Sequence, residues 1–312
     1  MPNSPLDLLA IGETLIDFIS TEPAESLSEA EQFRRHLGGS PANIAVTVAR
    51  LGGRAAVASR VGAGALGRFV RRELEQRGVI TDYLCHDPDY RTTIILVTKT
   101  EGTPDFEVFH GADAQLQPDD VPEEALARAT VVHTSTFALA RNPCRQTVIG
   151  AMRRAAALGK VVSLDPNYSP KLWPDIEEAR AVLTELYAHV TITKPSLDDA
   201  ARLFGGDMTP EQSVRRFHEL GPRTVVLTMG KRGTLLSHAG QLTHIPARLV
   251  DVVDATGAGD AFYGGFLTAY TDGLTLVQCV HVANAVVAQK LQRVGQLTEP
   301  LNKQAIYAMV GI

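Results

Sequence analysis

Three small residues, Gly257, Ala258 and Gly259, stand directly before the carboxylate of Asp260, and a helical apolar pattern follows at once. A glycine at a helix start costs conformational entropy, so this position must need bare backbone rather than side chains. The first N–H groups of a helix lack intrahelical partners, and the helix dipole adds partial positive charge there. Small side chains let an anion approach closely, which suits a phosphate or a phosphoryl group in transfer.

Asp260 would lie beside this anion site, where its negative charge repels a resting phosphate. A carboxylate in that place suits a different task, which is to accept the proton of an attacking hydroxyl group. An anion site next to a general base is the minimum equipment for phosphoryl transfer to an alcohol. From these residues alone, an aspartate that only stabilises the helix start is an equally good interpretation.

The elements that must position these groups alternate between β-rich runs and helical patterns. Near-continuous Val, Ile and Leu in the β-rich runs indicates strands that are buried on both faces. Strands alternating with helices predict right-handed βαβ units around a mainly parallel sheet, and therefore an α/β fold. Strands are expected at 6–12, 54–61, 130–136, 160–166, 189–194 and 223–230, and helices at 41–52, 67–78, 144–159 and 197–205.

Two β-rich stretches, 15–20 and 92–111, lack a following helix. The second contains the polar turn EGTPD between two β-runs, which is typical of a hairpin. We expect these insertions to form a small β-sheet over one edge of the core, in the position of a lid. Edge hairpins of the main sheet are the alternative.

Composition excludes several classes of protein. The formal net charge of -5 over 312 residues argues against nucleic-acid binding. No apolar run is long enough for a membrane span, and the first residues lack the features of a signal peptide, so we expect a cytoplasmic protein. Three distant cysteines and nine scattered histidines fit neither a disulfide framework nor a zinc site. The P-loop, G-x-S-x-G and H-E-x-x-H motifs do not occur.

One motif favours another class of enzyme. Gly62, Gly64 and Gly67 in GAGALG match G-x-G-x-x-G between an expected strand and helix, and Asp82 lies at a suitable distance for a ribose contact. This pattern is typical of nicotinamide- or flavin-dependent oxidoreductases. It belongs to the second βα unit rather than the first, and glycines are frequent in this chain, so the signal is weak.

Two longer motifs resemble those of the ribokinase-like sugar kinases, the PfkB family. DATGAGD at 254–260 resembles the second signature of that family, and 38–69, which begins GGSPANIAV, resembles the first. The resemblance covers nearly the whole chain in the right order. It implies a Rossmann-like three-layer α/β core with a small β-sheet lid, in one kinase domain over 1–312. The lid would be formed by about 14–37 and 91–115, and a homodimer through the lid is a further expectation.

The resemblance assigns a role to each matching residue. Asp260 resembles the catalytic base, and Gly257, Ala258 and Gly259 resemble the anion hole. The sugar would be bound by hydrogen-bonding groups with fixed positions, namely Asp17, Gly38, Gly39, Asn43, Asp165 and Asn167. ATP would be bound by Lys194, by Thr228, Gly230 and Gly233 of TMGKRG, and by Asn284. The expected cofactors are ATP and Mg²⁺, with K⁺ as an additional ion at Asp254, Thr256 and Gly295.

The sequence also departs from the family pattern. Where many members have N-x-x-E to organise magnesium, this chain has Ser196 and Asp199; an aspartate can serve Mg²⁺ through water, but its reach is shorter. In the 2-keto-3-deoxygluconate kinases two arginines resemble a carboxylate clamp, and here Ser169 and His110 stand in their places. Neither suits a carboxylate as arginine does, although Arg91 could compensate.

These departures favour a neutral sugar. We therefore expect an ATP-dependent sugar kinase that phosphorylates a primary hydroxyl of fructose or a related hexose. The alternatives are a 2-keto-3-deoxygluconate or 5-dehydro-2-deoxygluconate kinase, a sugar- or nucleotide-binding protein without activity, and, more remotely, the oxidoreductase indicated by GAGALG.

Overall fold

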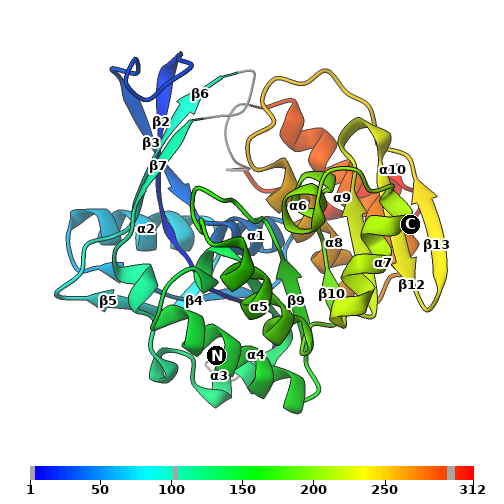
Figure 1. Ribbon diagram of the computed structural model, residues 1–312, viewed down its shortest axis with the longest axis horizontal. Helices are drawn as coiled ribbons and strands as arrows, with labels where there is room; N and C mark the ends of the chain where they lie inside the picture. Colours follow the sequence, from blue (N-terminus) through cyan, green and yellow to red (C-terminus); the bar gives the residue numbers. More distant parts are fainter. Residues whose placement is uncertain (1–3, 101–104, 294–298) are drawn as a thin grey trace.

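Residues 4–100, 105–293 and 299–312 are described by the computed structural model, and Figure 1 shows how their elements are arranged. Within them lies a nine-stranded sheet of order β13-β12-β11-β10-β9-β8-β1-β4-β5. The strands from β11 to β5 are all parallel, whereas β12 is antiparallel to both of its neighbours, β11 and β13. Their bounds are Leu6–Ile11 (β1), Ala55–Gly62 (β4), Ile80–Asp87 (β5), Ala129–Ser135 (β8), Val161–Asp165 (β9), Ile192–Thr193 (β10), Thr224–Thr228 (β11), Thr234–His238 (β12) and Gln241–Ile245 (β13).

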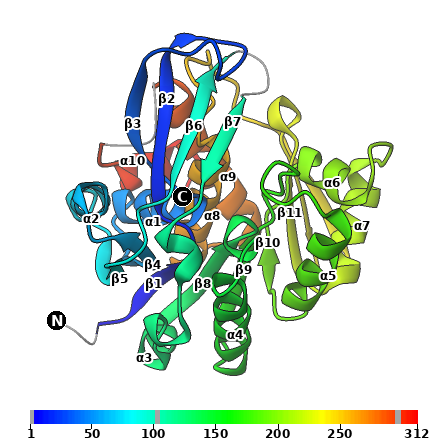
Figure 2. The ribbon, with the colours of Figure 1, turned by 60° about the vertical axis from the view of Figure 1, so that its left-hand side comes forward.

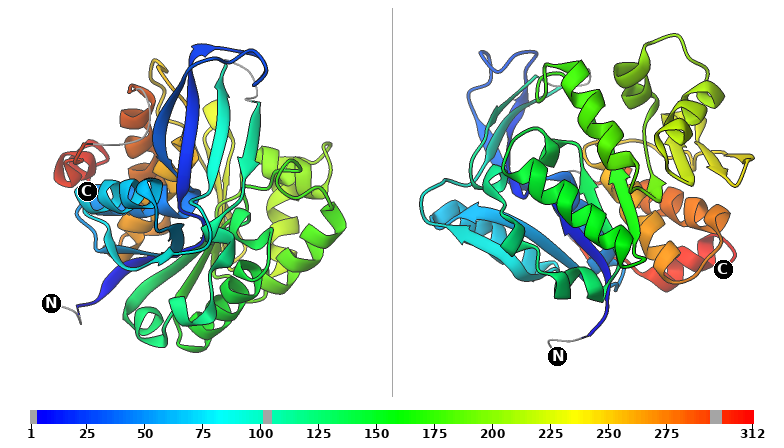
Figure 3. Two further views of the ribbon diagram at one scale, coloured as in Figure 1. Left: turned by 90° about the vertical axis from the view of Figure 1, so that its left-hand side faces the viewer. Right: turned by 60° about the horizontal axis from the view of Figure 1, so that its bottom comes forward.

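Helices cover both faces of this sheet, because alternate side chains of each buried strand point to opposite sides. Leu8 of β1 belongs to an apolar cluster with α1, α2, α8, α9 and α10, whereas Leu9 belongs to a cluster with α3 to α7. Figure 3 shows the resulting layers from two sides. The helices are Ser40–Arg50 (α1), Ala65–Gln76 (α2), Glu123–Arg128 (α3), Cys144–Ala157 (α4), Ile176–Tyr187 (α5), Leu197–Phe204 (α6), Pro210–Leu220 (α7), Ala258–Thr271 (α8), Leu276–Leu291 (α9) and Lys303–Met309 (α10). Short 3₁₀ turns span Ala112–Gln115 (η1), Pro118–Asp120 (η2), Phe137–Leu139 (η3) and Gly230–Arg232 (η4).

The two stretches without helices form a separate four-stranded sheet of order β3-β2-β6-β7. It consists of Leu15–Pro23 (β2), Phe33–Gly38 (β3), Ile94–Lys99 (β6) and Phe106–Phe109 (β7). Figure 2 shows these strands rising from the core beside β1 and β4. The expected α/β core with a small second sheet is therefore confirmed, and the alternative of edge hairpins in the main sheet is wrong.

Three strands of the main sheet were not expected from the sequence. β5 is an edge strand in which only Thr81, Leu84 and Asp87 are buried, so it lacks the continuous apolar run of a central strand. β12 and β13 are joined by Ala239 and Gly240, which both have positive φ, as a tight hairpin turn requires. No helix in the described ranges is long and apolar enough to cross a membrane.

The topology gathers polar residues at one edge of the sheet. Glu13 follows β1, Ser135 ends β8 and Asp165 ends β9, while Lys194 and Met229 follow β10 and β11. Because parallel strands present their carboxyl ends at the same edge, residues far apart in sequence meet there.

Candidate active site

Asp260 lies in the first turn of α8, after a glycine that shapes the turn. Gly257 has φ 72° and ψ 12°, a left-handed conformation that favours glycine, and α8 begins at Ala258. The start of α8 has no side-chain cap, so no side chain satisfies its first N–H groups. A Cβ at Gly259 would lie 3.4 Å from Nζ of Lys194. The backbone expected to form an anion site is thus uncovered and faces an ammonium group.

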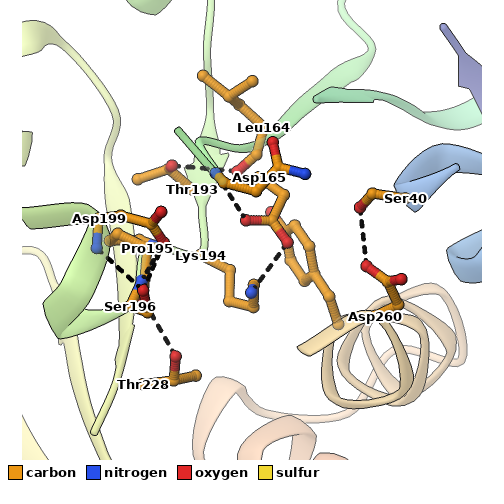
Figure 4. A network of polar contacts seen from close by, with 12 residues as sticks. Ser40, Leu164, Asp165, Thr193, Lys194, Pro195, Ser196, Asp199, Thr228 and Asp260 are labelled. Atoms are coloured by element: carbon orange, nitrogen blue, oxygen red, sulfur yellow. Dashed lines mark hydrogen bonds and ion pairs between the residues drawn. The ribbon is translucent and has the colours of Figure 1, made fainter. Parts of the chain in front are cut away.

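Both carboxylate oxygens of Asp260 accept hydrogen bonds from the start of α1. Ser40 Oγ donates to Oδ1 at 2.8 Å, and Asn43 Nδ2 donates to Oδ2 at 2.9 Å. Figure 4 shows the contact with Ser40. Burial raises the pKa of Asp260 to about 6, against the lowering effect of the hydrogen bond from Asn43. A carboxyl group with this pKa is ionised at neutral pH and still basic enough to accept a proton.

Asp17 reaches the same region from the small sheet. Its carboxylate lies against Gly38, where an added Cβ would come within 2.4 Å of Oδ2. Burial, followed by the charge of Asp260, raises the pKa of Asp17 to about 7. Gly39, at φ 98°, lies against the carbonyl of Glu13, so a side chain there would collide with the backbone. The residues expected to bind sugar therefore do meet beside Asp260.

Glu13 is a buried residue of this site that the sequence did not indicate. Its Oε1 accepts the Ser40 N–H at 3.1 Å, and Ser135 Oγ donates to its carboxylate oxygens at 2.8 and 2.7 Å. Burial raises its pKa to about 8. Glu13 thus joins the end of β8 to the start of α1, which holds Asp260. The only signal in the sequence was the position of Glu13 at the end of a buried strand.

A buried ion pair lies on the other side of Asp260. Nζ of Lys194 is 2.9 Å from Oδ2 of Asp165, and both side chains are almost fully buried. Burial opposes the charge of Lys194, but the surrounding carboxylates, first Asp165, raise its pKa above its usual range. Lys194 is therefore a protonated, fixed cation beside the start of α8.

Of these groups, Asp165, Lys194, Gly259 and Asp260 border one cavity of about 650 Å³. It lies at the carboxyl ends of the central strands, the usual place for a ligand in an open α/β sheet. Residues predicted from the sequence for several roles line it: Lys194, Thr228 and Gly230 for the nucleotide, Gly257 and Gly259 for the anion site, Asp260 as the base, Asp199 for Mg²⁺, and Asp165 and Asn167 for the sugar.

Two predicted nucleotide residues do not line this cavity. Gly233 lies against the carbonyl of Ile245, where a Cβ would be 2.2 Å away, and it shapes the start of β12. Asn284 of α9 donates through Nδ2 to the Pro246 carbonyl at 3.1 Å. Both therefore hold the β12–β13 region and the loop after it.

Asp199 is engaged in capping α6. Its Oδ2 accepts from Ser196 N at 2.8 Å and from Ser196 Oγ at 2.6 Å, and Oδ1 accepts the Tyr168 N–H at 3.1 Å. Figure 4 shows this cluster at the cavity wall. Within the described residues, no group of three His, Cys, Asp or Glu is arranged to hold a metal ion.

His110 and Arg91 lie away from this cavity. His110 packs against Phe137, with ring centroids 5.3 Å apart, and burial followed by the charge of Arg141 lowers its pKa to about 4. His110 is therefore neutral. Arg91 is exposed and accepts the Ala112 N–H through its carbonyl. Arg141, which the sequence did not single out, shares a small pocket with His110 and has no carboxylate partner in the described part of the chain.

The loop before α8 holds two of the three expected ligands of a monovalent cation. Thr256 N donates to Asp254 Oδ1 at 2.8 Å. Nζ of Lys290, from α9, donates to the Asp254 carbonyl at 2.6 Å and lies 3.6 Å from Asp254 Oδ2. The third expected ligand, Gly295, is outside the described residues.

Two glycines of GAGALG, Gly62 and Gly67, have a packing role. A Cβ at Gly67 of α2 would lie 1.8 Å from the Gly62 carbonyl, and one at Gly62 would lie 2.7 Å from Thr92 N. These close approaches join β4, α2 and the base of the small sheet. They explain Gly62 and Gly67 without a dinucleotide, whereas a Cβ at Gly64 would meet no atom within 4 Å.

The sequence and the fold were compared with those of known proteins, and the matches belong to sugar kinases. The profile of the pfkB family carbohydrate kinases matches residues 6–303. An ATP-dependent 6-phosphofructokinase of Thermoanaerobacterium thermosaccharolyticum is 36% identical over 293 residues, which are 94% of this chain and 90% of that protein. The fructokinase structure from Halothermothrix orenii has 39% identity and a TM-score of 0.81, covering 94% of this chain and 100% of that one.

A double-mutant fructokinase of Vibrio cholerae O395, solved with fructose, ADP and potassium ion bound, has 28% identity and a TM-score of 0.86, with 98% of each chain covered. The family profile and these similarities extend over nearly the whole chain, and the oxidoreductase interpretation is thereby excluded. The chain belongs to the pfkB family of carbohydrate kinases.

Proposed function

We propose that this carbohydrate kinase transfers the γ-phosphoryl group of ATP to a primary hydroxyl of fructose or a related neutral hexose. The observation that carries the proposal is the position of Asp260. It lies beside the uncovered start of α8, borders a cavity of about 650 Å³, and has its pKa raised by burial to about 6. This combination supports a general base next to an anion site.

In the proposed mechanism Asp260 accepts the proton of the sugar hydroxyl as that oxygen attacks phosphorus. The hydrogen bonds from Ser40 and Asn43 orient the carboxylate, and they do not depend on substrate. The N–H groups at the start of α8 receive the charge that develops on the phosphoryl oxygens. Lys194, fixed by Asp165, adds a positive charge beside the same turn.

Asn43 also supports sugar binding. Its Nδ2 is occupied by Asp260, whereas its Oδ1 is buried and has no hydrogen-bond partner. A buried acceptor without a partner is costly, so a ligand hydroxyl is the natural donor. Asp17 contributes a second acceptor from the small sheet, and the absence of side chains at Gly38 and Gly39 lets the Asp17 carboxylate and the Glu13 carbonyl lie close to the backbone there. Asp165 and Asn167 would border it from the end of β9.

ATP would occupy the cavity between Lys194, Thr228 and Gly230, while Gly233 and Asn284 hold the β12–β13 region and the loop after it. The fructokinase from Vibrio cholerae was solved with ADP and fructose bound together, which supports separate places for the nucleotide and the sugar. Mg²⁺ would supply neutralisation of the triphosphate charge. Because both Asp199 oxygens already accept hydrogen bonds, the fit favours a contribution from Asp199 through water, which is common for this ion.

A second candidate substrate is a sugar that carries an anionic group, and Arg141 is the observation that favours it. This arginine lies beside neutral His110 without a carboxylate partner in the described residues, so its positive charge is available to an anionic ligand. Arginine is well suited to phosphate and carboxylate groups. The relative named as a 6-phosphofructokinase makes fructose 6-phosphate the first anionic sugar to test.

The experiment is a comparison of kcat/KM for fructose, fructose 6-phosphate, 2-keto-3-deoxygluconate and 5-dehydro-2-deoxygluconate. We expect fructose to be the best substrate, and Arg141→Gln to leave its kcat/KM nearly unchanged, as in the surface control Arg153→Gln. If an anionic sugar is preferred and Arg141→Gln removes that preference, the second candidate is correct. If the preference persists, Arg91→Gln and Ser169→Arg test the remaining positions.

A further inference from the structure

Lys290 is a buried lysine that the proposed mechanism does not use. It lies in the last turn of α9, and its side chain is 1% exposed. A buried ammonium group is unfavourable unless oxygen atoms surround it. Here the partner is Asp254, through the carbonyl at 2.6 Å and through Oδ2 at 3.6 Å. Burial lowers the pKa of Lys290, and the charge of Asp254 opposes that effect.

The loop contacted by Lys290 leads directly into the anion-binding turn. Asp254 Oδ1 accepts the Thr256 N–H at 2.8 Å, and Gly257 follows in its left-handed conformation. The same loop is bound to the end of α9 by its backbone, since Val253 N donates to the Leu291 carbonyl at 2.7 Å. Lys290 and Leu291 thus hold this loop from adjacent positions of one helix.

These contacts bear on the K⁺ site expected from the family. A monovalent cation is bound by carbonyl and carboxylate oxygens, which are the groups that Asp254 presents. An ammonium group already lies on that carbonyl and close to that carboxylate. A second cation sharing these oxygens would be placed beside a like charge. The described residues therefore fit one cation at Asp254, and the chain itself supplies it.

We propose that the Lys290 ammonium is a built-in monovalent cation, which positions the loop 254–256 and makes nucleotide binding independent of K⁺. The inference rests on the proposed role of 257–260 in binding phosphate. Lys290 is a positioning residue in this account, because it acts on the anion-binding turn through Asp254.

The first test uses the unaltered protein. The dissociation constant for ADP is measured by titration calorimetry, and kcat/KM for ATP by a kinase assay, in KCl, NaCl and choline chloride at equal ionic strength. We expect each quantity to vary by no more than about twofold among the three salts, because no coupling to an external cation is present. An increase of about 5- to 150-fold in ADP affinity with K⁺ alone, the usual range for coupled sites, would overturn the inference. Absence of nucleotide binding in every salt would instead refute the proposed function.

The second test compares Lys290→Met, Lys290→Arg and the control Lys303→Met, whose ammonium pairs with Asp272 at the surface. In choline chloride, Lys290→Met should weaken ADP binding by about tenfold or more, and KCl should restore much of the loss. Lys290→Arg and Lys303→Met should bind ADP as the parent does. Undiminished binding by a folded Lys290→Met in choline would contradict the proposal. So would a loss that neither K⁺ nor arginine relieves, since it would indicate packing alone. If Lys290→Met does not fold, the arginine variant and the salt series still test the proposal.

Discussion

The hydrogen bonds of Asp260 fix the orientation of its carboxylate, and together with burial they set its pKa. Ser40 and Asn43 hold the carboxylate in place, while its own helix supplies the N–H groups that face an incoming phosphate. Each hydrogen bond to the ionised form lowers the pKa, and burial raises it. The balance keeps Asp260 ionised at neutral pH, which is the form that a general base requires.

Replacing Asp260 tests the proposed base directly. Asp260→Asn keeps the size of the side chain and removes its basicity, so kcat should fall by about 10²–10⁴-fold. ADP affinity should fall little, because the backbone of the anion site is unchanged. Asp207→Asn, an exposed position, is the matched control. Steady-state kinetics and titration calorimetry make the comparison, and turnover within a few-fold of the parent would remove Asp260 from this role.

The pH profile should show the ionisation of Asp260. Its ionised form is the active one, so kcat/KM should rise with pH through about 6 and then level. Asp17, with a pKa of about 7, titrates in the same range, and the inflection therefore belongs to the pair. Ser40→Ala removes a hydrogen bond that lowers the pKa of Asp260, so its inflection should move to higher pH. A shift to lower pH, or a shift equal to that of Ser28→Ala, would count against this account.

Among the elements, α1 has the central position because it touches both sheets. Its first residue donates a backbone hydrogen bond to Glu13 after β1 and a side-chain hydrogen bond to Asp260 of α8. Farther along, Gly264 of α8 lies against Thr47 of α1, where a Cβ would be only 2.4 Å from the threonine Cβ. A displacement of α1 would therefore move the base and the sugar-binding loop together.

Glu13→Gln tests how the start of α1 is held. Burial raises the pKa of Glu13 to about 8, so the folded protein keeps a proton that the unfolded chain releases at lower pH. Protonated Glu13 therefore contributes fully to the free energy of unfolding at pH values below its pKa in the unfolded chain. This contribution is lost as pH rises toward 8. The variant lacks this dependence, so its thermal midpoint relative to the parent should improve between pH 5.5 and pH 8. The opposite trend would show that Glu13 is ionised when folded. Glu13→Ala should lose stability at both pH values.

Two helical glycines should respond to alanine with opposite signs. Gly67→Ala places a Cβ 1.8 Å from the Gly62 carbonyl, so α2 must shift away from β4 at a cost of about 1–3 kcal/mol. Gly150 of α4 has no atom within 4 Å of the new Cβ, and alanine there should stabilise the helix by about 0.5–1 kcal/mol. Urea denaturation of the two variants measures both effects. Equal changes would refute the packing role of Gly67.

At the scale of the whole molecule, the proposed function assigns the two substrates to residues of different sheets. The small sheet carries Asp17 and Gly38, whereas the large sheet and its helices carry Lys194, Thr228 and the start of α8. Phosphoryl transfer requires both groups of residues at once, so binding must bring the two sheets to a defined separation. The expected dimer through the small sheet and the single-domain division stay predictions.

Hydrogen exchange can test whether the sugar and the nucleotide bind to residues of different sheets. Fructose alone should protect amides of β2 and β3 and the start of α1, because in the proposed function its hydroxyls bind Asp17 and Asn43. ADP alone should protect the turn after β11 and residues 257–260, which face the large cavity. Mass spectrometry of peptides from the two regions distinguishes them, with α4 as an internal reference. Protection of both regions by either ligand alone would show that the sheets close as a unit.

Sequence alone predicted the features that depend on neighbouring residues. The small residues before Asp260 indicated an uncovered helix start, and alternating strands and helices indicated a parallel sheet, because both signals are contained in short segments. The edge strand β5 was not predicted in this way, because its partial burial depends on its place at the edge of the sheet. The hairpin β12–β13 was not predicted because its turn includes Ala239 in a conformation rare for alanine.

Contacts between distant residues were decided by the tertiary structure. Ser40 and Asp260 are separated by 220 positions, and Glu13 and Ser135 by 122, yet each pair is joined by hydrogen bonds. Only the order of the strands in the sheet brings such residues to one edge. The same holds for Lys290, which looks like an ordinary helical lysine until α9 is packed against the loop of Asp254. Local patterns specified which groups the chain could use, and the strand order and helix packing determined which of them meet.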